Sequence, residues 1–204
     1  MTERIINFVS GFIRDQYLLS AVLSILPVTE IKGSVLFAAA SGFDPILSFL
    51  AAYGASLLLA AVLSISFPFF VGMAERSEKV RRILDFLSER LMKRVEKLRK
   101  ESSSAENLRE NKLAFGVFAF VALPLPLTGV WAGALLAAIL RLPSFRTFFA
   151  LAAGNFVAGG IVLAISLLAG AHAEFVLTLF LLLACVLLAC ALLRSVLSRR
   201  KQRT

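Results

Sequence analysis

The strongest constraint in this sequence is a set of long stretches without a charged side chain. Such stretches cover residues 45–74, 113–140, 147–173 and 175–193. A helix needs about 20 predominantly apolar residues to cross the hydrocarbon core of a bilayer, and 46–72, 147–170 and 175–193 each meet that length. The sequence therefore predicts an all-α integral membrane protein.

Composition excludes the soluble and disordered classes. The chain is 59% hydrophobic and 17% charged, whereas a soluble domain is roughly half apolar and about a quarter charged, and disordered chains carry far less apolar side chain. Cys185 and Cys190 lie in an apolar run, and His172 has no Cys or His nearby. We therefore expect no disulfide, metal or cofactor. We also expect no enzyme, because no nucleophile–base or metal-ligand constellation is present.

The net charge of +9 is concentrated beside the apolar stretches. Twelve of the 22 basic residues lie between Glu75 and Lys112, five lie in the tail, and Arg141 and Arg146 flank a short loop. Basic residues near membrane segments stay in the cytoplasm, so all three regions are predicted to be cytoplasmic. Nucleic-acid binding is excluded, because the central segment is nearly balanced, with 12 basic and 8 acidic residues. We expect a multi-pass protein of the inner (plasma) membrane with a cytoplasmic C-terminus.

Two segments are interrupted in a way that spanning helices are not. Residues 16–42 contain Pro27, Glu30 and Lys32, and residues 113–140 are broken by a run from Pro124 to Gly129. Each half is too short to cross the bilayer, and proline and glycine expose backbone groups that need protein or water around them at membrane depth. These patterns favour two re-entrant hairpins.

An alternative interpretation treats residues 5–28 as one crossing with the amino terminus inside. It satisfies the charge rule equally well. It places Arg14 and Asp15 at mid-span, where each costs about 2.5–3.5 kcal/mol on insertion scales. Re-entrance is therefore preferred.

The two predicted hairpins resemble each other in sequence. Pro27-Val28-Thr29 matches Pro126-Leu127-Thr128 at an offset of 99, and at an offset of 100 the matches are Gly33, Leu36, Phe49 and Gly54 with Gly133, Leu136, Phe149 and Gly154. The charge rule opens the first hairpin outward and the second to the cytoplasm, so the repeats are predicted to be inverted, as in many secondary transporters. The predicted organisation is an interfacial amphipathic helix (1–15), repeat 1 (16–74, hairpin 16–42 and span 46–72), a cytoplasmic basic amphipathic helix (75–112), repeat 2 (113–170, hairpin 113–140 and span 147–170), a C-terminal span (175–193) and a basic cytoplasmic tail (194–204).

The hairpin breaks supply the candidate site for a substrate or coupling ion. An ionisable residue inside lipid is a functional candidate, so Glu30 could carry a proton or a cation, and Lys32 could tune its pKa or pair with an anionic substrate. Alternatively, both lie at the interface. Trp131 either stacks in the site or anchors at the interface, and Asn155 either completes the site or bonds a neighbouring carbonyl. The remaining candidates are Pro27, Thr29, Pro124, Pro126, Thr128 and Gly129.

At these hairpins, over about residues 20–165, the chain resembles the bacterial and archaeal small multidrug export family. That family has a Pro-x-x-Glu-Leu-Arg-Gly-type first motif and an Ala-x-Pro-Leu-Pro-Gly-Thr-Gly-x-Trp-Thr-Gly-Ala-type second motif. The matching residues are Pro27, Glu30, Lys32, Gly33, Pro124, Leu125, Pro126, Gly129, Trp131, Gly133 and Ala134. The departures are Lys32 in place of arginine, Leu127-Thr128 in place of Gly-Thr, and Ala132 in place of threonine.

The resemblance implies a membrane transporter or exporter, with proton or ion coupling as one option and a site between the hairpins. The family looks distantly related to the DedA superfamily, which shares paired re-entrant hairpins and includes undecaprenyl phosphate translocases. The arginine motif of the DedA second hairpin is not found at Pro126. Alternative functions are a DedA-type lipid-carrier translocase and a non-transporting scaffold acting through helix 76–100. The expected partners are membrane lipid, a small-molecule, ion or lipid-linked substrate, and a further copy of the chain in a homo-oligomer.

Overall fold

A computed structural model of the chain describes residues 15–74, 78, 105–169, 175–180, 182, 183, 185, 186 and 189. The described residues form helices and contain no strand, which confirms the predicted all-α class for this part of the chain. The helices are α2 (Gln16–Ile25), α3 (Glu30–Ala40), α4 (Pro45–Ala74), α6 (Ala105–Ala122), α7 (Val130–Ile139) and α8 (Ser144–Ala169). Residues 175–180 are also helical.

Helices α4 and α8 are the two long apolar elements of the described chain. They have 30 and 26 residues, and both are long and apolar enough to cross a membrane. At about 1.5 Å per residue, each exceeds the roughly 30 Å of hydrocarbon in a bilayer. Only 17% of the most apolar part of α4 and 44% of that of α8 is buried inside the protein. The outward-facing apolar surface fits a membrane protein.

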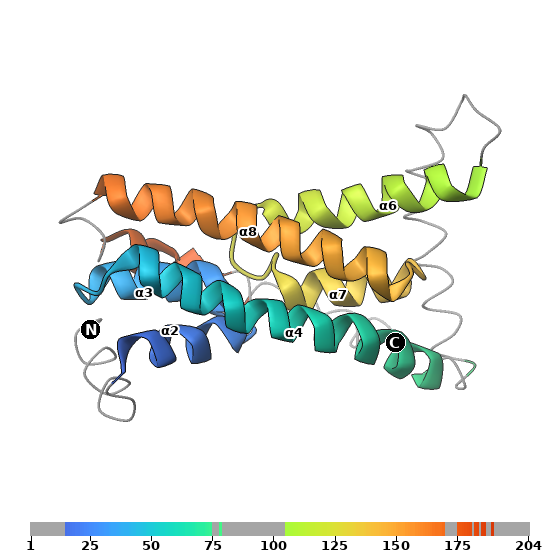
Figure 1. The fold of residues 1–204 in the computed structure, drawn as a ribbon, viewed down its shortest axis with the longest axis horizontal. Coiled ribbons are helices and arrows are strands. Elements are labelled where there is room, and N and C mark those ends of the chain that lie inside the picture. Colours follow the sequence, from blue (N-terminus) through green and yellow to red (C-terminus); the bar gives the residue numbers. More distant parts are fainter. Residues whose placement is uncertain are drawn as a thin grey trace, which may run out of the picture.

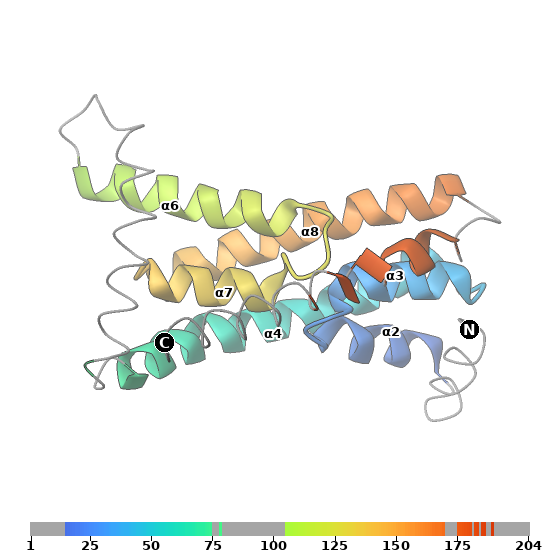
Figure 2. The same ribbon diagram turned by 180° about the vertical axis from the view of Figure 1, so that it is seen from behind.

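The shorter helices form two hairpins that flank the long pair. Helices α2 and α3 approach from one end of the molecule, and α6 and α7 approach from the other, so that the two breaks meet near the middle of the long helices (Figures 1 and 2). Helix α2 packs on α4, as α6 packs on α8, while α3 also contacts α8 and α7 contacts α4. The two apolar cores of the described residues follow this division, one around each hairpin.

The turn after α3 and the turn after α7 have the same backbone geometry. The C-cap residues of α3 and α7, Ser41 and Leu140, both have helical φ and have ψ of 0° and −2°. The next residues, Gly42 and Arg141, both have positive φ, 73° and 55°. The closing bonds also match, Phe43 N to Ala38 O at 2.9 Å and Leu142 N to Ala137 O at 3.0 Å. Each hairpin is therefore connected to the long helix that follows it by an equivalent turn.

Helix α2 begins at Gln16 and is capped by Asp15, which bears on the single-crossing alternative. Asp15 has extended backbone (ψ 118°), and its carboxylate accepts from the backbone N–H groups of Tyr17 and Leu18 at 2.9 and 2.8 Å. An Asp in this position is a standard helix N-cap. Arg14 and the residues before it lie outside the described residues, and in the described part of this segment the helix runs from Gln16 to Ile25.

Several predicted segments fall largely outside the described residues. These are the interfacial helix at 1–15, most of the cytoplasmic helix at 75–112 and the tail at 194–204, while the C-terminal span is described in part. Helix α6 begins at Ala105, ahead of the charge-free stretch that starts at 113. Its first turns therefore belong to the charged segment.

Gly154 provides a test of how α6 and α8 pack. A Cβ at this position would lie 2.7 Å from the backbone oxygen of Phe118 and 2.9 Å from Cβ of Val121, whereas a Cβ at Gly54 would meet nothing within 4 Å. We expect Gly154→Ala to lower the free energy of unfolding by about 1–3 kcal/mol through overpacking. Gly54→Ala, the matched control, should raise it by about 0.5–1 kcal/mol. Unfolding in mixed micelles measures both, and equal stability of the two variants would contradict this packing.

Candidate functional site

The first break joins α2 to α3 through residues 26–29. Its closure depends on Thr29, whose hydroxyl donates to the backbone oxygen of Leu23 at the end of α2. Pro27 lies within the turn and cannot continue α2. Glu30, the first residue of α3, has a positive φ of 50°. A positive φ is uncommon outside glycine, and such strained residues cluster at functional sites.

In the second break, residues 123–129, a threonine hydroxyl again contacts backbone carbonyl groups. The Thr128 hydroxyl, which has one hydrogen to donate, lies within hydrogen-bond distance of the backbone oxygens of Leu123 at 3.0 Å and Leu125 at 2.9 Å. Pro124 and Pro126 lie in this break, and Leu127 has a positive φ of 67°. In each hairpin a threonine therefore satisfies carbonyl groups that the end of a helix leaves free.

Glu30 and Lys32 form a buried ion pair where the breaks meet. Their side chains are 2% and 0% exposed, and Lys32 Nζ lies 3.4 Å from Glu30 Oε2. The ammonium also donates to the backbone oxygen of Leu125 at 2.9 Å and to Thr128 Oγ1 at 3.1 Å. An ammonium has three donors, so all three have acceptors here. The Lys32 ammonium on the first hairpin is thus stabilised partly by hydrogen-bond acceptors on the second hairpin.

Gly129 completes this contact on the side of the second hairpin. A Cβ at this position would overlap the Glu30 carboxylate, so glycine lets that carboxylate lie directly against the backbone. Oε1 of Glu30 is buried and has no hydrogen-bond partner in the part of the chain that is described. A buried oxygen without a partner is costly, and it can accept a proton or bind a cation.

Trp131 makes the converse contact, from the second hairpin to the first. Its Nε1–H donates to the backbone oxygen of Ile25 at 2.9 Å, and its ring meets that of Phe67 edge-on, with centroids 6.3 Å apart. Trp131 follows Lys32 at the same offset of 99 that relates the prolines. Residues at matching positions therefore each donate to a backbone carbonyl of the opposite hairpin.

Asn155 lies in a different contact from the Glu30–Lys32 pair. It is buried on α8, and its Nδ2 donates to Ser56 Oγ on α4 at 2.7 Å, while Oδ1 has no partner among the described residues. Asn155 therefore joins the two long helices. Sequence reasoning missed Ser56, although its offset of 99 from Asn155 was available as a signal.

The structure thus brings together most of the predicted site residues. Those at the junction are Pro27, Thr29, Glu30, Lys32, Pro124, Pro126, Thr128, Gly129 and Trp131. The sequence did not indicate which backbone carbonyl groups accept hydrogen bonds from Lys32 and Trp131. Within the described ranges, no group of three or more His, Cys, Asp and Glu residues could hold a metal ion.

Comparison with known families bears on this arrangement. A family model described as "Putative small multi-drug export protein" matches residues 30–161, which run from Glu30 in α3 into α8. The chain belongs to this family. No curated protein and no solved structure matches. The family description is that of a membrane exporter rather than an enzyme, and it implies small-molecule substrates. The DedA resemblance stays a sequence-based prediction.

Proposed function

We propose that this member of the small multidrug export family is a proton- or ion-coupled exporter whose site is the junction of the two hairpin breaks. The observation that carries the proposal is the buried Glu30–Lys32 pair at that junction. Ionisable residues among apolar helices are expensive, and in transporters they mark substrate or proton pathways. An apolar bundle without such a role would be stable without them.

The proposed architecture is an inverted repeat of re-entrant hairpin plus spanning helix. Helices α2, α3 and α7 have 10 or 11 residues, or about 15 Å each, half of the roughly 30 Å hydrocarbon core. The approach of the hairpins from opposite ends (Figure 1) and the matched turns after α3 and α7 support this arrangement. Transporters of this kind work by rocking one repeat against the other around a central site.

Lys32 would couple the binding of a proton or cation at Glu30 to the contact between the two hairpins. Its ammonium bridges Glu30 on its own hairpin to the Leu125 carbonyl and the Thr128 hydroxyl on the other. A proton or a cationic substrate at Glu30 competes with Lys32 for the carboxylate. The released ammonium would then change its contacts with the second break, so loading and hairpin movement occur together.

Flux in proteoliposomes tests the proposal. Purified protein is reconstituted, and movement of a small cationic dye such as ethidium is followed with and without a pH gradient. We expect a gradient to accelerate flux well above that of protein-free liposomes. Dye flux that stays the same when a proton gradient or a sodium gradient is applied would rule out coupling to these ions. An absence of flux for every cationic dye tried would overturn the substrate assignment.

Site-directed labelling tests the orientation. Single cysteines are placed at Ser41, Ala173 and Ser103 in a background without Cys185 and Cys190, and intact cells are treated with an impermeant maleimide. The positive-inside rule predicts labelling at Ser41 and Ala173 and protection at Ser103 until the cells are opened. Ala173 and Ser103 lie outside the described residues. Labelling of Ser103 from outside would reverse the proposed topology.

A further inference from the structure

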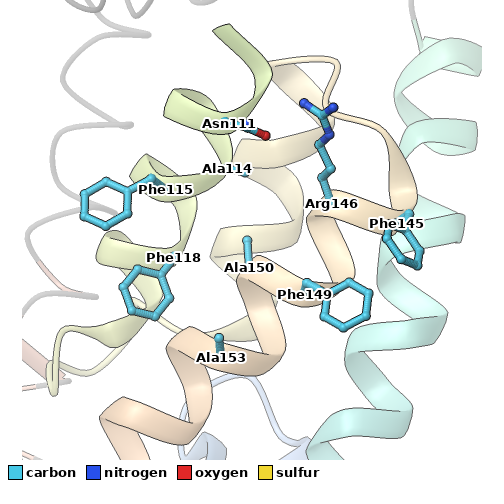
Figure 3. Close-up of a pocket in the computed structure, with 9 residues that line it drawn as sticks. All are labelled: Asn111, Ala114, Phe115, Phe118, Phe145, Arg146, Phe149, Ala150 and Ala153. Carbon is cyan, nitrogen blue, oxygen red and sulfur yellow. The ribbon is translucent and has the colours of Figure 1, made fainter. Parts of the chain in front are cut away.

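A groove between α6 and α8 lies apart from the junction of the breaks. Its volume is about 480 Å³, within the range of roughly 300–1,000 Å³ typical of ligand sites. The lining side chains come from these two helices alone, as the close-up shows (Figure 3). They are Asn111, Ala114, Phe115, Phe118, Phe145, Arg146, Phe149, Ala150 and Ala153.

The long part of the groove is shaped for an apolar chain. Alanines of both helices form its floor, and phenylalanine rings stand on either side of it (Figure 3). Phe145 and Phe149 meet edge-on with ring centroids 4.7 Å apart, and Phe115 and Phe118 lie 5.8 Å apart. Each wall of the groove therefore contains a pair of contacting rings.

One end of the groove is polar and basic. Arg146 of α8 lies at this end, as does Asn111 of α6 (Figure 3). The guanidinium of Arg146 pairs with the carboxylate of Glu110 at 2.7 Å. Lys112, which follows Asn111 in the chain, is exposed. A guanidinium has five donors in a planar fork, so it can bond a carboxylate and a phosphate oxygen at once.

We propose that this groove binds an anionic phospholipid, with an acyl chain along the alanine floor and the phosphate between Asn111 and Arg146. An apolar channel that ends in a basic group matches the two chemical parts of such a lipid. A second copy of the chain fits less well, because two copies meeting at this face would bring Arg146 and Lys112 against the same charges. The orientation proposed above places the lipid in the cytoplasmic leaflet.

Native mass spectrometry tests the site independently of transport. The full chain is exchanged into detergent that contains equal amounts of phosphatidylglycerol and phosphatidylcholine, and retained lipid is counted. Arg146→Gln should reduce the preference for phosphatidylglycerol about fivefold, the value of one basic side chain near an anionic headgroup. Ala153→Phe fills an exposed position on the groove and should reduce retention of both lipids.

Matched controls lie outside the groove. Arg141→Gln removes the same charge from the turn that precedes α8, and Ala164→Phe adds the same ring at an exposed position further along α8. Neither should change lipid retention. The proposal fails if Arg141→Gln and Arg146→Gln behave alike, or if Ala153→Phe retains as much lipid as the parent. A loss of dimer mass in Ala153→Phe with unchanged lipid binding would instead identify the face as a contact between chains.

Discussion

Glu30→Gln is expected to enter the membrane and to reduce gradient-driven flux to the level of protein-free liposomes. The substitution keeps the shape of the side chain but removes the carboxylate that a proton or cation would occupy. The amide can still approach Gly129, and Lys32 keeps its acceptors at Leu125 and Thr128. Membrane-fraction yield and flux at several pH values separate insertion from coupling.

Two companions distinguish a coupling role from a structural one. Glu30→Asp keeps the ionisable group with a shorter side chain, so it should retain a pH-dependent flux at reduced rate. Glu174→Gln, at a position that the sequence places in an outer loop and that lies outside the described residues, should transport like the parent. If Glu30→Gln transports like the parent at every pH, Glu30 is structural and the coupling proposal is wrong.

The positions of the two breaks could be predicted because their causes are local. Proline ends a helix wherever the chain continues, and the charges at Glu30 and Lys32 interrupt an apolar stretch in a way that composition alone reveals. The bounds of α4 follow from the same reasoning, since the charge-free stretch 45–74 ends at a charged residue on each side. The starts of α6 at Ala105 and of α8 at Ser144, ahead of Arg146, do not, because a helix can extend into a charged segment.

The partners across the hairpins could not be predicted in the same way. Which carbonyl accepts from Lys32, or from Trp131, depends on how two segments about a hundred residues apart approach each other. Asn155 illustrates this point. Its polarity indicated a buried hydrogen bond, but its partner Ser56 is set by the packing of α4 on α8. The repeat in the sequence reduces the number of candidate hydrogen-bond partners only if the two halves are assumed to be related by a two-fold axis.

Lys32→Met should strongly lower the stability of the folded protein. It leaves the Glu30 carboxylate buried without a counter-charge and removes the donor to the Leu125 carbonyl. Removing one partner of a buried ion pair typically costs about 3–5 kcal/mol. We expect a loss of this size in the free energy of unfolding measured in mixed micelles. Flux should fall as well, because the link between the hairpins is broken.

The double variant Lys32→Met with Glu30→Gln separates the charge from the packing. Removing the carboxylate charge should restore a substantial part of the stability that Lys32→Met loses, since much of that cost is the uncompensated charge. Flux should stay at background, because the coupling group is gone. Equal stability of the Lys32→Met single variant and the double variant would mean that Glu30 carries no charge once Lys32 is removed, and that the lost stability comes from the missing contact with Leu125 rather than from an uncompensated charge.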